Sequence, residues 1–285
     1  MINGKTKLVA FFAHPAKHSM SPLMHNTSYE SLGLNYRYLA FDIGEDEDAI
    51  KEAVQSMKRL GIAGANVSMP FKKTIIPYLD EVEEGALLAD SVNTVVNRDG
   101  RLYGYSTDGA GFVDSLSARG ISLSGKKIFL VGCGGAGRAI LIASAKAGAH
   151  VVVFNRPGRR YDEGLRIVDA LRQTDGSRAE IFSLEDRERF EAEIKDSDII
   201  VNATNLGMGE HEDESWLYEP KLIQNAKLIY DCIYEPRETK LMKDAKAAGV
   251  EAMNGLEMLL YQGAAAHELI TGVPMDVDSV RKVLK

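Results

Sequence analysis

Short apolar runs alternate with amphipathic segments along nearly the whole chain. Runs of strand character cover residues 7–13, 36–42 and 64–67, and helical periodicity follows the first two runs at residues 22–32 and 49–60. A strand followed by a helix and another strand is the repeating unit of parallel sheets. The pattern therefore predicts an α/β fold.

A second series of alternating elements begins near residue 108. Just before it, residues 94–97 and 102–104 predict a hairpin that turns at Asp99 and Gly100. The elements predicted after it are helices at 111–119, 138–147, 163–173, 257–270 and 277–284, and strands at 126–131, 150–156, 179–182, 199–203 and 228–232. This succession is typical of a doubly wound dinucleotide-binding domain of the Rossmann type.

Composition narrows the class of protein further. The 285 residues carry a net charge of −7 at pH 7, which offers no basic footprint for a nucleic acid. No apolar run approaches the roughly 18 residues of a membrane span, and the first residues lack the pattern of a signal peptide. Cys133 and Cys232 have no CxxC spacing, and no metal site is expected. We expect a reduced, cytoplasmic protein without nucleic-acid or membrane partners.

A glycine-rich segment follows the predicted strand at 126–131. Residues 132–137 read Gly-Cys-Gly-Gly-Ala-Gly, a GxGxxG pattern placed between a strand and a helix. Such a loop lets backbone N–H groups approach a pyrophosphate at the helix N-terminus. A turn without ligand is the alternative, but the context favours a dinucleotide. The candidate residues are Gly132, Gly134, Gly135, Ala136 and Gly137.

The end of the next strand bears on the choice of cofactor. A site for NAD usually has an acidic residue there for the ribose 2′-hydroxyl. This chain has Asn155 and Arg156, then Pro157, Gly158, and the arginines at 159 and 160. Arginines suit a 2′-phosphate, so the segment favours NADP over NAD, with Asn155, Arg156 and Arg160 as candidates. A solvated basic turn is the alternative.

Polar residues stand at unusual places in the first part of the chain. Ser19 and Ser21 precede a helix opened by Pro22, where they could receive a carboxylate or merely cap the helix. Asn66, Ser68 and then Lys72 follow a predicted strand end, where ligands bind in α/β sheets.

Lys72 is the candidate for proton transfer. A lysine in a partly desolvated cleft can transfer a proton near neutral pH, whereas a solvated surface lysine is the alternative. Asp108 lies where the chain should pass between domains, and its carboxylate would fix and charge-stabilise Lys72. The alternative is an ordinary aspartate in a turn or at a helix N-cap. The polar segments at 91–94 and 104–109 accompany Asp108.

These segments together resemble the shikimate dehydrogenase family over nearly the whole chain. Residues 19–22 resemble its SxSP motif, residues 66–72 its NVTxPxK motif, and residues 106–108 its NTD segment. Further matches are Asn93 with Thr94, the loop at 202–208, the segment 231–236 around Tyr234, and residues 258–263 around Gln262. Ser68 replaces a threonine, Ser106 an asparagine, and Pro157 a threonine of the family pattern.

The resemblance implies a function and a set of roles. It implies reversible hydride transfer between shikimate and NADP, with Lys72 and Asp108 catalytic. Substrate would be bound by Ser19, Ser21, Asn66, Ser68, Asn93, Thr107, Tyr234 and Gln262. Thr204, Met208, Gly255 and Met258 would join the cofactor residues. The alternatives are a quinate/shikimate dehydrogenase that uses NAD and, from another class, a non-catalytic NADP-binding sensor.

The resemblance also implies the domain plan. Residues 1–107 with 254–285 would form the substrate domain, because the final helices return to it, and residues 108–253 would bind the dinucleotide. The protein would be a monomer or a homodimer.

Overall fold

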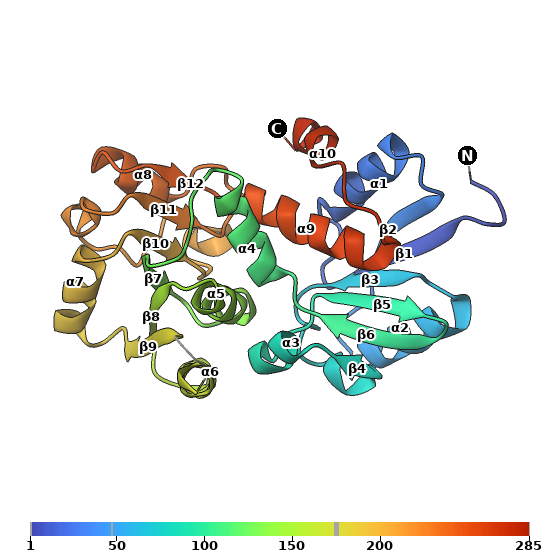
Figure 1. Ribbon diagram of the computed structural model, residues 1–285, viewed down its shortest axis with the longest axis horizontal. Coiled ribbons are helices and arrows are strands. Elements are labelled where there is room, and N and C mark those ends of the chain that lie inside the picture. The colour runs from blue at the N-terminus through green and yellow to red at the C-terminus, as the bar shows by residue number, and fades with distance from the viewer. Residues whose placement is uncertain (1, 47, 174–176, 285) are drawn as a thin grey trace. The chain divides into compact units, whose positions relative to one another are not determined.

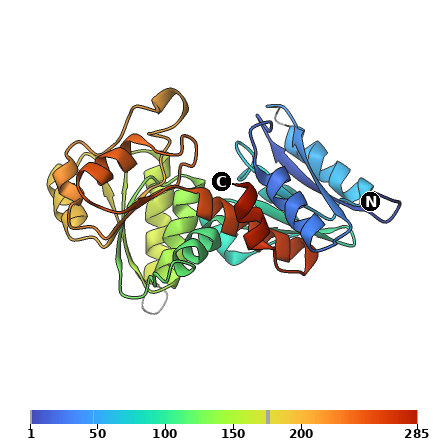
Figure 2. The same cartoon turned by 90° about the horizontal axis from the view of Figure 1, so that it is seen from above.

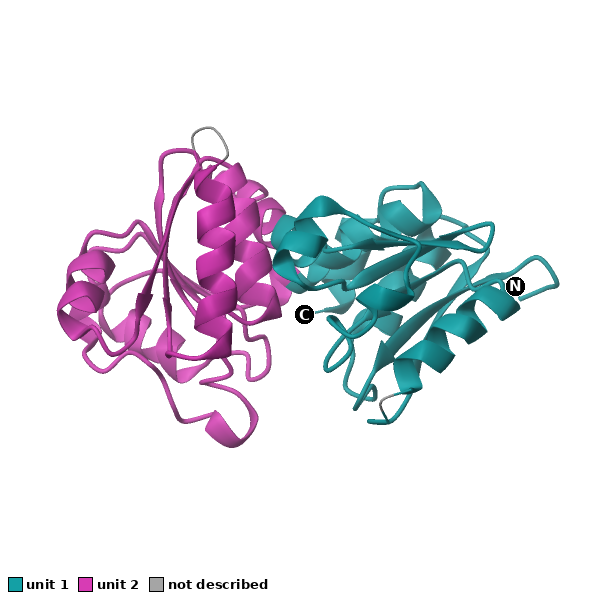
Figure 3. Ribbon diagram, turned by 90° about the horizontal axis from the view of Figure 1, so that it is seen from below, with its two compact units in different colours: residues 1–111, 259–285 teal, residues 112–258 magenta. Residues whose placement is uncertain are grey.

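The computed structural model describes residues 2–46, 48–173 and 177–284. The chain forms two compact units, residues 1–111 with 259–285 and residues 112–258, coloured separately in Figure 3. No helix in the described part of the chain is long and apolar enough to cross a membrane.

The first unit is built on a mixed six-stranded sheet with the order β2-β1-β3-β5-β6-β4 (Figure 1). Its strands are β1 (Lys7–Ala13), β2 (Tyr36–Asp42), β3 (Gly64–Val67), β4 (Glu81–Val82), β5 (Thr94–Arg98) and β6 (Arg101–Tyr105). Its helices are α1 (Ser21–Ser31), α2 (Ala49–Leu60), α3 (Glu84–Ala89) and α10 (Val277–Val283). β1, β2 and β3 are parallel, and β5 pairs antiparallel with both β3 and β6. The predicted hairpin is thereby confirmed.

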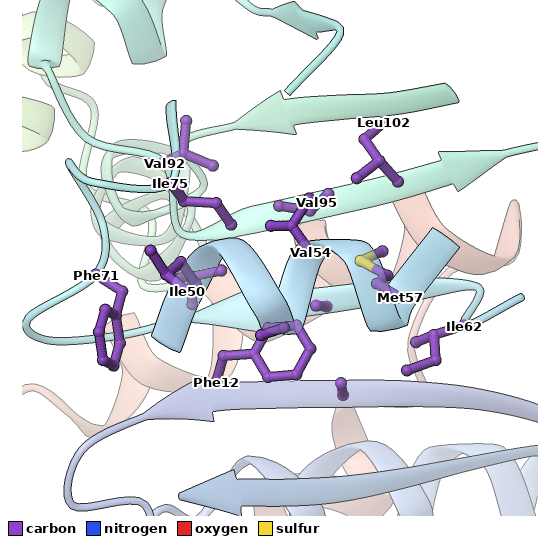
Figure 4. Packing of buried hydrophobic residues seen from close by; sticks show 14 of the residues in the cluster. Phe12, Ile50, Val54, Met57, Ile62, Phe71, Ile75, Val92, Val95 and Leu102 are labelled. Carbon is purple, nitrogen blue, oxygen red and sulfur yellow. The ribbon is translucent and has the colours of Figure 1, made fainter. Parts of the chain in front are cut away.

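Alternation along β1 gives this sheet two apolar faces. Ala10 and Phe12 face α2, where Ile50, Val54 and Met57 pack on them (Figure 4). Val9, Phe11 and Ala13 belong to the core on the other face, with Tyr29 of α1 and Ile270. Successive side chains of a strand point to opposite faces, so a fully apolar strand is buried on both sides. Figure 2 shows α1 and α2 separated by the strands.

The second unit is a parallel six-stranded sheet with the order β12-β11-β10-β7-β8-β9. Its strands are β7 (Lys127–Val131), β8 (His150–Asn155), β9 (Arg178–Ser183), β10 (Ile199–Asn202), β11 (Leu228–Asp231) and β12 (Ala252–Met253). Its helices are α5 (Gly135–Lys146), α6 (Arg159–Arg172), α7 (Arg187–Lys195) and α8 (Lys240–Ala247). α5 and α6 lie on one face, and α7 and α8 on the other (Figure 1).

The sequence passes from one unit to the other within two helices. The chain enters the second unit within α4 (Asp108–Ser117) and leaves it within α9 (Leu256–Thr271). α4, α5 and α6 all begin three or four residues earlier than the apolar pattern predicts. Their first turns hold glycine or charged residues, which add nothing to an apolar periodicity. The α/β class with a doubly wound sheet is confirmed.

Candidate active site

Strand directions in the first unit bring distant polar segments to one edge of its sheet. β3 ends at this edge, and β5 begins there because Asn66 and Thr94 are register partners. β6 returns to the same edge, since Thr94 is also paired with Tyr105. Residues that follow β3 and β6 and precede β5 therefore lie close together.

Lys72 and Asp108 meet at this edge. Lys72 Nζ lies 2.6 Å from Asp108 Oδ2, and the exposed fractions of the two side chains are 24% and 9%. Asp108 is the first residue of α4, where a carboxylate also interacts favourably with the helix dipole. The pair is thus a partly buried, charge-assisted hydrogen bond whose ammonium still reaches solvent.

Asn93 fixes the carboxylate from the other side. Its Nδ2 donates to Asp108 Oδ1 at 2.7 Å and to Thr107 Oγ1 at 3.0 Å, while its Oδ1 accepts from the Thr107 backbone N–H. Gln262 of α9 joins this group, with Oε1 3.4 Å from Asn93 Nδ2. Five of the predicted residues are therefore in one connected cluster.

Asn66 forms a second polar group beside the first. Its Nδ2 donates to the Asn93 carbonyl and to Thr94 Oγ1, and its Oδ1 accepts from the Tyr38 hydroxyl at 2.9 Å. Burial raises the pKa of Tyr38 well above its usual range, so this hydroxyl stays protonated and donates. Ser21 also hydrogen-bonds to Tyr38.

The two serines near α1 have different environments. Ser19 Oγ accepts from the backbone N–H of Ser21, the first residue of α1, at 3.2 Å, whereas the N-cap of the helix is Met20. Ser21 is buried beside Tyr38. Ser68 is half-buried directly after β3.

The glycine loop of the second unit is shaped as a close backbone turn. A Cβ on Gly132 would lie 2.7 Å from the Ala203 carbonyl oxygen, and one on Gly137 would lie 2.2 Å from the Gly132 carbonyl oxygen. Gly132 also has a φ of 102°, which favours glycine. Space beside Gly134, the N-cap of α5, is open, so the loop and the first turn with Gly135 and Ala136 fit a bound pyrophosphate.

Basic residues surround the end of β8. Asn155 Oδ1 accepts from the Cys133 backbone N–H at 3.1 Å, which joins this strand end to the glycine loop. Arg159 is engaged by Glu163, which also binds Arg138. Within residues 2–46, 48–173 and 177–284, Arg156 and Arg160 form no ion pair, and both are exposed. Two guanidinium groups are thus available to a phosphate.

The remaining candidates surround the ends of β10 and β11. Thr204 Oγ1 donates to Asn202 Oδ1 at 2.7 Å, and Met208 is 41% exposed. Gly255 donates its N–H to the Ile233 carbonyl, and a Cβ there would lie 2.0 Å from the Cys232 carbonyl oxygen. Two further residues complete the set, the half-buried Tyr234 and the buried Met258.

Comparison with known proteins decides the family. The model of the shikimate dehydrogenase substrate-binding domain matches residues 11–95, and that of the shikimate 5-dehydrogenase C-terminal domain matches residues 255–285. The shikimate dehydrogenase (NADP(+)) of Streptococcus uberis is 42% identical, over 99% of this chain and 97% of its own. The chain belongs to the shikimate dehydrogenase family.

Solved structures of this family share the fold over full length. Shikimate 5-dehydrogenase from Listeria monocytogenes, in complex with shikimate and NAD, has a TM-score of 0.93 at 39% identity and covers 100% of this chain and 98% of its own. The Thermus thermophilus enzyme, in complex with NADP(H) and shikimate, has a TM-score of 0.83 at 34% identity, covering 97% and 98%. The predicted family and fold class are confirmed.

Two residues of the polar clusters were not predicted to belong to a shikimate dehydrogenase site. Tyr38 and Thr94 both hydrogen-bond to the Asn66 amide. Tyr38 lies within an ordinary strand pattern, and Thr94 belongs to the Asn93–Thr94 match without a predicted role of its own. The ring of Tyr38 also stacks on His25 of α1, with centroids 4.4 Å apart and planes 6° apart. No signal in the sequence marks Tyr38, because it continues the strand pattern that begins at Tyr36.

Proposed function

We propose that this protein is a shikimate dehydrogenase that reversibly oxidises the 3-hydroxyl of shikimate with NADP. The observation that carries the proposal is the Lys72–Asp108 pair, held by Asn93 at the edge of the first unit. A lysine that still reaches solvent and is oriented by a buried carboxylate is suited to proton transfer. Membership of the family supplies the reaction class, an oxidoreductase acting on an alcohol.

The chain's own residues would divide the work as follows. In oxidation, the Lys72 ammonium first releases a proton to solvent, and the neutral amine then accepts the hydroxyl proton. In reduction, the ammonium donates that proton back to the carbonyl oxygen, and Asp108 orients Nζ throughout. Ser19 and Ser21 bind the carboxylate at the start of α1. The ring hydroxyls would be bound by Ser68, Asn66, Asn93, Thr107, Tyr234 and Gln262. Asn66 already donates both amide hydrogens to the protein, so it would act through the second lone pair of Oδ1.

In the second unit, the predicted contacts give the dinucleotide one orientation across the strands, with its adenosine half near β8 and its nicotinamide half near β10 and β11. The pyrophosphate belongs at α5, and Asn155, Arg156 and Arg160 beyond β8 would take the 2′-phosphate of the adenosine half. The nicotinamide half must then extend the other way, over β10 and β11, toward Thr204, Met208, Gly255 and Met258. The bound cofactor supplies the hydride acceptor, whereas positioning is the protein's part.

The domain plan follows from these roles. Residues 1–107 with 254–285 would bind substrate, and residues 108–253 would bind the cofactor. We expect the enzyme to act in the cytoplasm as a monomer or a homodimer.

Initial rates of cofactor reduction test the proposal. Shikimate and quinate should each be assayed with NADP⁺ and NAD⁺ under the same conditions. The highest kcat/KM is expected for shikimate with NADP⁺. NADP⁺ is favoured because Arg156 and Arg160 have no carboxylate partner among the described residues and can bind the 2′-phosphate. A higher value for quinate or for NAD⁺ would instead support the quinate/shikimate alternative. An absence of turnover with every pair would contradict the proposed function.

A further inference from the structure

The last residue of β11 is a buried aspartate, Asp231. It lies next to the two loops that follow β10 and β11. Asp231 is fully buried, and its register partner Asn202 ends the neighbouring parallel strand and is also fully buried. Asp231 Oδ1 accepts from Asn202 Nδ2 at 2.9 Å and from the Ile233 N–H at 3.1 Å. Its Oδ2 accepts from Thr239 Oγ1 at 2.7 Å. The Asn202 and Ile233 N–H groups can only donate, and the Thr239 hydroxyl, which accepts from the Met242 N–H, is placed to donate to Oδ2. This arrangement favours the charged carboxylate.

This negative charge has no cationic partner. All three donors are neutral, and Asp231 forms no ion pair with any residue in the described part of the chain. Burial raises the pKa of Asp231, as expected for a carboxylate that no nearby cation stabilises. A buried charge balanced only by dipoles projects its field over a longer range than a neutralised pair.

The network around Asp231 reaches the cofactor loops of the second unit. Asn202 Oδ1 accepts from the N–H and hydroxyl of Thr204. A Cβ on Gly132 of the glycine loop would lie 2.9 Å from Thr204 Cγ2. On the other side, Cys232 follows Asp231 directly, and its carbonyl packs on Gly255. The carboxylate thus lies under the segments that the proposed function assigns to the nicotinamide half.

The two redox forms of the cofactor differ in charge at that half. The oxidised nicotinamide ring carries a positive charge that the reduced ring lacks. We propose that the buried carboxylate of Asp231 selects between the redox forms, favouring NADP⁺ over NADPH through its field and holding both cofactor loops in place. This inference rests on the proposed function, because it uses the assigned direction of the dinucleotide.

Dissociation constants of NADP⁺ and NADPH measure this selection directly. NADPH binding is followed by its own fluorescence, and NADP⁺ binding by displacement of NADPH. In Asp231→Asn, the ratio Kd(NADP⁺)/Kd(NADPH) should rise roughly three- to tenfold, the scale of one charge acting over about 10 Å through protein of intermediate dielectric. Asp231→Ser is a second neutral variant if Asp231→Asn does not fold.

Matched variants separate charge from structure. Asp198→Asn removes a carboxylate that directly precedes β10, at the opposite end of the strands from Asp231. It should leave the ratio Kd(NADP⁺)/Kd(NADPH) unchanged. Thr239→Val removes a donor but keeps the Asp231 charge, so it should weaken both forms without raising the ratio. The exchange Asn202→Asp with Asp231→Asn restores a carboxylate to the pair and should restore the ratio.

Emission of Trp216, the single tryptophan, monitors the integrity of the network, because its indole donates to Asn202 Oδ1 at 3.1 Å. A folded neutral variant with the wild-type ratio would overturn the inference. Failure of the wild-type protein to bind either form would instead overturn the proposed function.

Discussion

Lys72 and its neighbour Lys73 differ in what they touch, although they are adjacent in sequence. Lys72 meets the buried Asp108, whereas Lys73 pairs with Asp90 further out. Lys72→Ala should lower kcat roughly a hundredfold or more, the usual scale of a lost general acid–base group, with a smaller effect on KM. Lys73→Ala is the matched control and should retain wild-type kcat. Equal kcat values in the two variants would exclude Lys72 from proton transfer.

Tyr38 provides a test of the second polar group. Tyr38→Phe removes the hydroxyl that donates to Asn66 Oδ1, which leaves that buried oxygen without this partner. We expect a stability loss of about 1 kcal/mol and a KM for shikimate raised several-fold, with kcat nearly retained. Steady-state kinetics and thermal unfolding measure the two effects. Tyr36→Phe, on the same face of β2, should change neither by a comparable amount.

Residues that act through their own chemistry could be predicted from the sequence, and those that act through a partner could not. Lys72, Asp108 and Asn93 stand out because a core does not favour such groups after strands. Tyr38 resembles any strand tyrosine, and its partner Asn66 is 28 residues away. In the sequence, Asp231 looks like an ordinary polar residue at the end of a strand. Only the structure shows its buried hydrogen bond with Asn202.

At the scale of elements, β2 is an edge strand, and a side chain of α1 forms hydrogen bonds with part of its outer backbone. The side chain of Asn26 in α1 accepts from the Tyr38 N–H and donates to the Tyr38 carbonyl, both at 2.9 Å. Leu39 and Phe41 nearby are 50% and 36% exposed. An open edge with apolar side chains is a template for pairing with another chain, and Asn26 blocks its centre.

Asn26→Ala should therefore destabilise the fold and open this edge. Loss of both hydrogen bonds is expected to lower the free energy of unfolding by about 1–2 kcal/mol. Light scattering at rising protein concentration should show more self-association than in the wild type. Asn35→Ala, which removes an exposed amide, is the control. Unchanged scattering would mean that β2 needs no such protection.

Elements with enough residues for a period were predicted, and shorter ones were not. β1, β2 and α2 have the bounds that the apolar pattern gives. The two-residue strands β4 and β12 are too short to show an alternation. They exist because β6 and β11 offer them backbone partners, which is information from the tertiary structure.

At the scale of the whole molecule, two buried histidines make stability depend on pH. Burial lowers the pKa of His25 to about 3 and that of His267 to about 4, from an ordinary 6.5. Both ring nitrogens of His267 are buried, and neither has a hydrogen-bond partner among the residues that the structure describes. The unfolded chain therefore binds these protons first, and stability falls as pH drops below 6.5.

The expected loss is about 2 kcal/mol between pH 6.5 and about 5.5, with roughly half from each ring. Urea unfolding at several pH values measures it. His267→Phe should remove part of this slope, whereas His211→Gln, at an exposed position, should not. A slope in His267→Phe equal to that of the wild type would show that this ring does not contribute.

The discontinuous first unit has a consequence for the order in which the protein can fold during synthesis. The second unit is continuous, so all of it is available once residue 258 has left the ribosome. The first unit must wait for the final segment, because Gln262 joins the Asn93 cluster and Ile270 packs so tightly on Gly64 that a Cβ there would lie 2.6 Å from its side chain. Domains usually fold in order from the N-terminus during synthesis. Here the first unit, whose synthesis starts first, can complete its folding only after the second unit has been synthesised.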